Sequence, residues 1–379
     1  MKRFGMMILI FGVLMCLLVV NASAVETSGE CGENAKWKIS GGTLTISGTG
    51  EMTDYYYLVG LERPGLEMAP WRDDETYTNT KITKIVIKSG ITRIGDNAFC
   101  CLPNVKSVTI PDTVTSIGQA AFCDIEKLTK ITIPESVTHM ERSVFSGCIG
   151  LTTVKLPSRM EEFEGIMFYE CSNLKHVTLP EGITKIEART FEDCFKLESV
   201  SIPEGVKEIE AKAFNCCENL KTVKLPDSLE SLGVNAFGDS GLVEITIPPN
   251  VREIYNDCFG WCFALKKVHF TGDAPNIHSD TFCCTTTTAY YPAENPTWTE
   301  EVRKDYDGTI TWIECGGQGD LDKNGPVNED DAIYLLQHVL MPGQFPITQD
   351  VDFDGNGRVN EDDVIYLLQH VLMPGQFPL

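Results

Sequence analysis

Large apolar residues return at one fixed spacing through the middle of the chain. Phenylalanine occurs every 23 residues, with one step of 22, at Phe99, Phe122, Phe145, Phe168, Phe191, Phe214, Phe237, Phe259 and Phe282. A self-similar period of about 20–50 residues is typical of a solenoid, in which each unit buries its apolar side only against its neighbours. The pattern therefore predicts a stacked array of nine units.

Residues 114–134, VTSIGQAAFCDIEKLTKITIP, illustrate how each unit is built. Ile131 and Ile133 alternate with Lys130 and Thr132, which predicts a short strand with one buried face. The segment GQAAF ahead of it predicts a single helical turn. A proline follows the strand in seven units, and because proline lacks a backbone N–H, the strand is expected to end there.

The polar positions of these strands define one outward surface, which we call the repeat face. Its members are Ser107, Thr109, Lys130, Thr132, Thr153, Lys155, His176, Thr178, Ser199, Ser201, Thr222, Lys224, Glu244 and Thr246. Two interpretations remain open. Rows of hydroxyls and lysines suit hydrogen bonding to a sugar or a peptide, and threonine also simply favours exposed strand positions.

The unit resembles the BspA-like leucine-rich repeat, whose pattern is matched by RIGDNAFCCLPNVKSVTIP at residues 93–111. The similarity covers residues 81–291, and the flanks resemble the family's N-terminal cap at 25–80 and C-terminal cap at 292–315. This resemblance implies an α/β repeat solenoid of short strands and single helical turns. It also implies a binding surface, because arrays of this family serve as adhesive and interaction scaffolds.

An aromatic cluster, DYYYL at residues 54–58, lies within the N-terminal cap segment. Exposed, these rings would form a platform on which sugar rings stack. Buried, they would cover the open end of the first repeat, a cover that every solenoid needs. We expect the cap.

The N-terminus has the features of an export signal. An apolar run is followed by Ala22 and Ala24 in an A-x-A pattern, which predicts a signal peptide at residues 1–24. A lipoprotein anchor at Cys16 is the alternative, but Met15 stands where that processing needs a small residue. No later stretch reaches about eighteen consecutive apolar residues. We therefore expect no membrane span and a secreted, extracellular protein, or one held at the cell surface through a scaffold protein.

The net charge of the chain bears on which classes of ligand it can bind. Asp and Glu number 54 against 31 Lys and Arg, so the formal net charge is -23 at pH 7. Nucleic acid binding depends on a basic surface, so no nucleic acid partner is expected. Metal cations are the more natural ligands of such a chain.

The C-terminus repeats itself. The sequence VNEDDAIYLLQHVLMPGQFP at residues 327–346 returns at 359–378 with one substitution, and a twelve-residue acidic loop leads into each copy. Ca²⁺ takes about six to eight oxygen ligands, which an EF-hand loop supplies from positions 1, 3, 5, 7, 9 and 12. The predicted metal ligands are Asp320, Asp322, Asn324, Pro326, Asn328 and Asp331 in one loop and Asp352, Asp354, Asn356, Arg358, Asn360 and Asp363 in the other. Pro326 and Arg358 would contribute backbone carbonyl oxygens. The sequence thus predicts two bound Ca²⁺ ions.

These paired segments resemble a type I dockerin, a small all-α, calcium-binding module of two loop-helix units. The similarity covers residues 319–379 after a linker at 316–318, with helices expected at 329–340 and 361–372 and no helix leading into either loop. It implies Ca²⁺-dependent binding to a cohesin domain of a scaffold protein, as in a cellulosome. The implied contacts with cohesin are Glu329, Asp330, Gln337, Glu361, Asp362 and Gln369. Near-identity of the two units implies two interchangeable docking poses.

Other reactive motifs have simpler structural interpretations. GDSG at 238–241 resembles a serine-peptidase motif, but Ser240 is in register with ordinary turn residues and no His and Asp are placed to complete a triad.

Most cysteines share the 23-residue phase, which suggests buried turn positions rather than zinc ligands. Disulfides between stacked coils are within reach, although parallel side chains give poor geometry. Cys31 and Cys315, at opposite ends, are not expected to pair.

Together these features predict a non-catalytic secreted binding protein. Its dockerin would attach it to a cellulosome-like scaffold, and its repeats would present a protein- or glycan-binding surface. An accessory or hydrolase component of polysaccharide degradation, or a host-surface adhesin, is the alternative.

Overall fold

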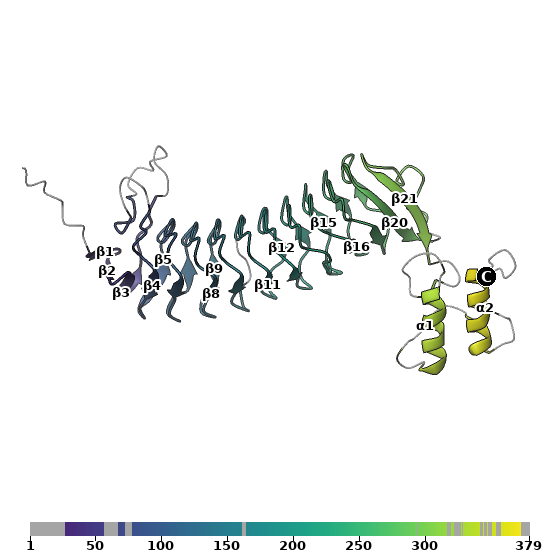
Figure 1. The fold of residues 1–379 in the computed structure, drawn as a ribbon, viewed down its shortest axis with the longest axis horizontal. Coiled ribbons are helices and arrows are strands. Elements are labelled where there is room, and N and C mark those ends of the chain that lie inside the picture. Colours follow the sequence, from purple (N-terminus) through teal and green to yellow (C-terminus); the bar gives the residue numbers. More distant parts are fainter. Residues whose placement is uncertain are drawn as a thin grey trace, which may run out of the picture.

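The computed structural model describes residues 27–56, 67–72, 78–160, 164–293, 295–316, 320–321, 327, 329–341, 344, 347, 351–353 and 358–372. The predicted signal peptide, with Cys16, lies outside these ranges. Coils of chain stack along one axis into an elongated solenoid, and two helices lie beyond its C-terminal end (Figure 1). The architecture is a repeat solenoid made mostly of strands.

The predicted strands form the first of two parallel ladders. They are β4 (Lys84–Ile87), β6 (Ser107–Thr109), β8 (Lys130–Thr132), β10 (Thr153–Lys155), β11 (His176–Thr178), β13 (Ser199–Ser201), β16 (Glu244–Ile247) and β18 (Lys267–Phe270). Equivalent residues of successive coils pair, as Thr153 does with His176. The ladder is interrupted twice: β6 and β8 are edges of two different sheets, and residues 221–225 form no strand.

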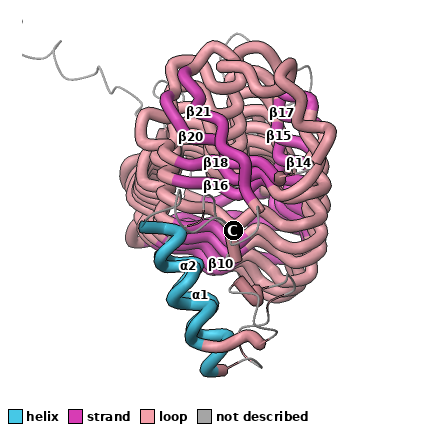
Figure 2. Tube along the Cα trace, turned by 90° about the vertical axis from the view of Figure 1, so that its right-hand side faces the viewer, coloured by secondary structure: helices cyan, strands magenta, loops and turns pink. Residues whose placement is uncertain are grey.

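A second parallel ladder comes from the residues just before each turn, and the sequence did not predict it. Its strands are β5 (Ile91–Ile94), β7 (Ser116–Ile117), β9 (His139–Met140), β12 (Lys185–Ile186), β14 (Glu208–Ile209), β15 (Ser231–Leu232), β17 (Glu253–Ile254) and β19 (Asn276–Ile277). Viewed along the solenoid, the two ladders line different sides of the coils (Figure 2). Within the described residues this ladder is interrupted between β9 and β12, and most coils pair with a neighbour on both sides.

The nine phenylalanines form one column inside the solenoid. Neighbouring ring centroids lie 5.2–5.9 Å apart with interplanar angles of 5–24°. All nine side chains are fully buried. Because a single coil cannot cover these rings, stacking is what removes them from water. The prediction of nine stacked units is confirmed.

The segment predicted as a helical turn is not a helix. Residues 118–122 form turns, and the residues two before and two after Phe122 have positive φ, 51° at Ala120 and 54° at Asp124. This left-handed conformation does not propagate a helix. Alternate N–H groups bond to the next coil instead, as Phe122 N–H does to the Val144 carbonyl at 3.1 Å. The helical prediction was wrong because the next coil takes the donors that a helix would use.

An antiparallel meander covers the N-terminal end. It consists of β1 (Ser28–Glu30), β2 (Asn34–Ser40) and β3 (Thr43–Glu51), and β3 pairs in parallel with both β4 and β5, so it starts both ladders. Tyr55, 4% exposed, packs edge-on against Trp71 with centroids 5.4 Å apart. Trp71 in turn stacks on Phe99 at 5.8 Å. Tyr55 thus covers the first coil, as expected, while residues 57–58 of the predicted cluster lie outside the described ranges.

The C-terminal end is closed by β20 (Thr286–Pro292) and β21 (Thr309–Cys315), which extend the first ladder in parallel. Trp298 and Trp312 pack on Phe270, with ring centroids 4.8 and 5.9 Å away. These indoles cover core that has no further coil to shield it.

The two helices have the bounds that the sequence predicted, α1 at Glu329–Leu340 and α2 at Glu361–Leu372. Three acidic residues open each helix, where negative charge is favourable. Leu335 and Leu367 are fully buried in a small core that is separate from the core of the solenoid. The helices therefore form a second packed unit with the described loop residues.

Candidate functional site

The repeat face is where the sequence placed it. All fourteen predicted residues are exposed, while intervening residues such as Ile131 and Val154 are at most 5% exposed. Thr222 and Lys224 keep their outward position although they belong to no strand. The alternation predicted from the sequence is confirmed along the ladder.

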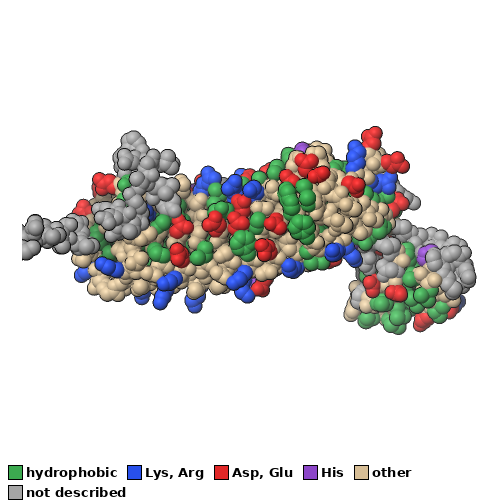
Figure 3. Space-filling model, turned by 45° about the horizontal axis from the view of Figure 1, so that its top comes forward, with side chains coloured by type: hydrophobic (Ala, Val, Ile, Leu, Met, Phe, Trp, Pro, Cys, Tyr) green, Lys and Arg blue, Asp and Glu red, His purple; other side chains and the backbone are tan. Residues whose placement is uncertain are grey.

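Lysines in the middle coils form ion pairs with glutamates one coil away. Lys175 Nζ lies 2.8 Å from Glu198 Oε1, and Lys155 Nζ lies 3.6 Å from Glu135 Oε1. These side chains are 45–68% exposed, so solvent screens the pairs and each adds little to stability. Lys and Arg gather along one edge of the solenoid, and Asp and Glu are frequent on the adjoining surface (Figure 3). The main effect of each pair is that the glutamate neutralises the positive charge of its lysine on the surface.

Two grooves lie on the repeat face. One of about 460 Å³ runs between residues 106–112 and 129–134 and is lined mainly by Ser, Thr and Lys. The other, about 420 Å³, lies between residues 153–158 and 178–181 and includes several Pro and Leu side chains. The first groove is more polar than the apolar pockets in which most small molecules bind.

At the turns, cysteine side chains form a buried row. Cys148 Sγ donates a hydrogen bond to the Phe122 carbonyl at 3.1 Å. The same bond to the preceding coil, at 3.0–3.3 Å, is made by Cys171, Cys194, Cys217 and Cys262. Burial raises the pKa of the Cys148 thiol to about 12. These thiols are neutral at physiological pH and occupy buried turn positions, as expected.

Ser240, the serine of the GDSG motif, occupies the same row. It is 5% exposed, and its Oγ lies 3.5 Å from Cys262 Sγ. A hydroxyl that replaces a buried thiol inside the stack is screened from substrates. The interpretation of Ser240 as an ordinary turn residue is confirmed.

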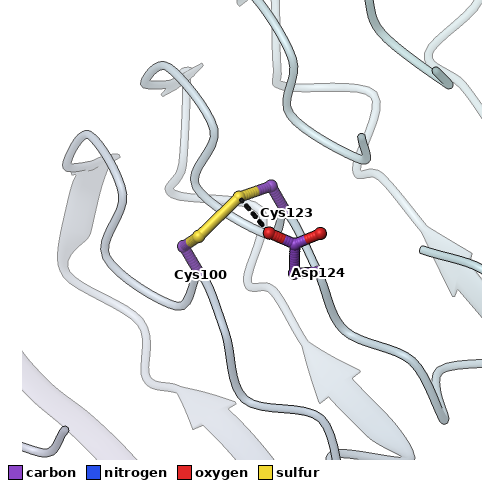
Figure 4. Close-up of side chains that lie close together, drawn as sticks. All are labelled: Cys100, Cys123 and Asp124. Carbon is purple, nitrogen blue, oxygen red and sulfur yellow. Dashed lines mark hydrogen bonds between the residues drawn. A yellow bond between two sulfur atoms is a disulfide. The ribbon is translucent and has the colours of Figure 1, made fainter. Parts of the chain in front are cut away.

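A disulfide joins Cys100 and Cys123 of the first two coils, with Cα atoms 4.6 Å apart (Figure 4). This separation falls within the usual range of about 4.4–6.8 Å. The bridge confirms that a disulfide between stacked coils is within reach, as expected. The Sγ of Cys123 lies 3.7 Å from Asp124 Oδ2. Cys31 and Cys315 are buried free thiols, as expected.

Half of the predicted calcium ligands can be placed. The described ones are Asp320, Asp331, Asp352, Arg358, Asn360 and Asp363. The others, Asp322, Asn324, Pro326, Asn328, Asp354 and Asn356, lie outside the described residues.

Three of the four described carboxylates are buried, and Asp352 is half-buried. Asp331 and Asp363, at position 12, are fully buried, and Asp320 at position 1 is 1% exposed. Asp331 Oδ1 accepts a 2.6 Å hydrogen bond from the Leu321 N–H, which draws the end of the loop to its beginning. Buried carboxylates are costly without compensating charge, and hard oxygen donors suit Ca²⁺. The described residues therefore fit the predicted metal.

The residues predicted to contact cohesin lie at the beginnings and middles of the helices. The acidic ones, Glu329, Asp330, Glu361 and Asp362, are exposed, and Gln337 and Gln369 are half-buried. Both helices therefore present the same acidic first turn to solvent.

An exposed apolar row accompanies these residues, and the sequence analysis missed it. On α1 it comprises Ile333, Leu336 and Leu340, which are 51, 38 and 63% exposed. On α2, Ile365 and Leu372 are 52 and 69% exposed. The signal was present, because EDDAIYLLQHVL contains more apolar residues than one buried stripe requires. We call these residues the apolar row.

The part of the chain that the structure describes contains no helix long and apolar enough to cross a membrane.

A family model described as the BspA type leucine-rich repeat region matches residues 73–198 and 184–300. No curated protein matches the chain. Among solved structures, a leucine-rich repeat protein from Eubacterium ventriosum is 24% identical, with a TM-score of 0.47, over 76% of this chain and 84% of that one. One from Bacteroides ovatus is 21% identical, with a TM-score of 0.46, over 74 and 76%. A leucine-rich cell surface protein from Faecalibacterium prausnitzii is 20% identical, with a TM-score of 0.36, over 78 and 96%.

Proposed function

This chain belongs to the BspA-type leucine-rich repeat family, and we propose that it is a non-catalytic, secreted binding protein with two separate binding parts. The C-terminal loop-helix pair, residues 319–379, is a dockerin that attaches the chain to a cohesin domain of a cellulosome-like scaffold. The repeat face binds a second ligand, a protein or a glycan. Joining the two in one chain raises the effective concentration of the scaffold near that ligand.

The observation that carries this proposal is the duplication of one exposed surface. Ile333 on α1 and Ile365 on α2 stand at equivalent positions and are 51 and 52% exposed. Exposed large apolar side chains next to an acidic helical turn are unfavourable on a surface that stays in water, and they mark interaction sites. Their repetition supports one partner that binds either helix. The acidic first turns favour a partner surface with an apolar centre and basic residues around it.

Calcium would make this surface possible. Asp320 and Asp331 in one loop, and Asp352 and Asp363 in the other, would hold the ions, together with the other predicted ligands. Bound Ca²⁺ supplies positive charge that offsets the mutual repulsion of the carboxylates, so ion binding and folding of the segment are coupled. The helices then keep fixed positions relative to each other.

The proposal is tested with the mature full-length chain and a panel of cohesin domains. Titration calorimetry should detect Ca²⁺ binding, and a chelator should remove helical circular dichroism and abolish cohesin binding while the solenoid remains folded. The Asp331→Asn, Asp363→Asn double variant should behave like the chelated protein, and Glu204→Gln, an exposed acid of the solenoid, serves as its control. Cohesin binding that survives the chelator would refute the calcium requirement.

Because the two helices carry equivalent exposed residues, single and double variants should differ in cohesin binding. Ile333→Asp alone and Ile365→Asp alone should each leave one docking pose intact and keep cohesin affinity within about twofold, since losing one of two equal poses costs only a factor of two. The double variant should abolish binding. Loss of binding in one single variant would show that only that helix docks.

A further inference from the structure

One of the two interruptions of the first ladder lies between β6 and β8. β6 and β8 belong to consecutive coils, yet each is the edge of a different sheet and the two strands are not paired. The rest of the stack continues across this point: Phe99 and Phe122 are stacked at 5.4 Å, and Arg93 of β5 pairs with Ser116 of β7. The opening is therefore confined to the repeat face.

The 460 Å³ groove occupies this opening, between residues 106–112 and 129–134. Its lining includes four hydroxyl side chains, Ser107, Thr109, Thr129 and Thr132. The facing edges of β6 and β8 also present backbone N–H and C=O groups that no described strand pairs. Such groups are satisfied by water or by a ligand. The groove thus offers donors and acceptors from both backbone and side chains.

Two lysines give the groove its charge. Lys106 and Lys130 stand on its two sides, and within the described part of the chain neither has a carboxylate within 4 Å, unlike Lys155 and Lys175 further along. Asp112 is the one acidic residue in the lining. In a chain of net charge -23, unneutralised ammonium groups beside hydroxyls select an anionic, hydroxyl-rich ligand.

We propose that the groove between β6 and β8 binds a segment of an acidic polysaccharide. Carboxylates of its uronic acid residues meet Lys106 and Lys130, and its hydroxyls bond to the Ser and Thr side chains and to the open strand edges. This inference rests on the proposed role of the repeats as the ligand-binding part and specifies what they bind. The lining holds no aromatic residue, which disfavours an acidic protein, because protein partners are anchored mainly by aromatic side chains.

The test is calorimetric binding of short oligogalacturonides to the mature full-length protein. Their methyl esters have the same sugar backbone without the charge and serve as the matched ligand control. Binding should occur only with the free acid and should weaken as salt is raised. Equal binding of the ester would overturn the proposal, and so would tighter binding of polyglutamate than of the oligogalacturonide.

Variants locate the site. Lys106→Gln, Lys130→Gln should weaken binding at least about tenfold, since two charge-assisted contacts are lost. Lys155→Gln, Lys175→Gln makes the same change in net charge on the same face and should stay within about twofold. Equal weakening by both pairs would overturn the assignment to this groove. Ca²⁺-dependent cohesin binding, measured on the same variants, reports separately on the proposed docking function, because neither pair lies in the loop-helix segment.

Discussion

Replacing Phe145 by alanine tests what holds the coils together. Its ring is fully buried and stacks between Phe122, 5.9 Å away, and Phe168, 5.7 Å away. The substitution removes one member from the middle of the column and separates its two neighbours. The strand pairs beside it remain, β9 with β7 and β10 with β8 and β11.

The magnitude follows from the surface that the ring buries. A phenylalanine buries about 150–250 Å², worth about 4–6 kcal/mol at about 25 cal/mol per Å², and alanine retains part of that burial. Truncation of Phe to Ala in well-packed cores costs about 3–5 kcal/mol. The cavity cannot close easily, because backbone bonds such as Phe145 N–H to the Met167 carbonyl fix the spacing of the coils. We therefore expect a loss of about 4 kcal/mol.

The assay is urea unfolding of the mature protein, followed by circular dichroism, with Phe263→Ala as the control. Phe263 is 68% exposed, so its removal should change the unfolding free energy by no more than about 0.5 kcal/mol. Repeat arrays unfold in steps, so the midpoint of the solenoid transition is the quantity compared. If the two variants differ by less than about 1 kcal/mol, the ladders rather than the column hold the stack, and the reasoning from buried area fails.

The cysteine row and the N-terminal cap lead to two more predictions. Burial raises the pKa of the Cys148 thiol to about 12. Iodoacetamide should therefore label the exposed Cys284 of the native protein at neutral pH and leave Cys148 unmodified, as read by mass mapping. Equal labelling of the two cysteines would contradict the buried row. Arg93→Met removes guanidinium bonds to Asp54 at 2.5 Å and Asp96 at 2.8 Å, and should cost about 1–2 kcal/mol at neutral pH. Burial alone would raise the pKa of Asp54, but hydrogen bonds, chiefly from Arg93, hold it below its usual range. Its contribution is present above the ordinary carboxyl pKa and is lost as pH falls through the lowered value, so the difference in Tm between wild type and variant should shrink in acid; a difference that grows would refute the assignment.

The sequence predicted the elements that carry a long or repeated signal. The alternation of Lys130, Ile131 and Thr132 marks both the strand and its exposed face, because side chains of a strand point to opposite sides. The second ladder escaped prediction because strands such as Ser116–Ile117 have two residues and show no period. The turn beside it was misassigned, because its left-handed residues are ordinary amino acids such as Ala120 rather than glycine.

Of the two candidate sites, too, one could be predicted from the sequence and the other could not. The acidic loop residues, including Asp331, could be predicted as metal ligands because a metal loop needs particular side chains at fixed spacing. The opening between β6 and β8 left no signal in the sequence, since SVT and KIT fit the repeat as well as the strands that do pair. Whether neighbouring strands approach closely enough to bond depends on the backbones of both coils. A groove of this kind is visible only in the three-dimensional structure.

The groove and the C-terminal helices lie at opposite ends of the structure. The groove lies in the first coils, and α1 and α2 lie beyond β21 at the other end (Figure 1). About eight coils separate them, so at about 4.8 Å per coil the separation approaches 40 Å. The column of nine stacked rings runs through the solenoid and makes bending of the solenoid costly. In the proposed complex the repeats therefore act as a spacer of set length as well as a binding part. Docking at one end then holds the acidic-polysaccharide groove away from the crowded scaffold. A long insoluble ligand can reach the groove in that position.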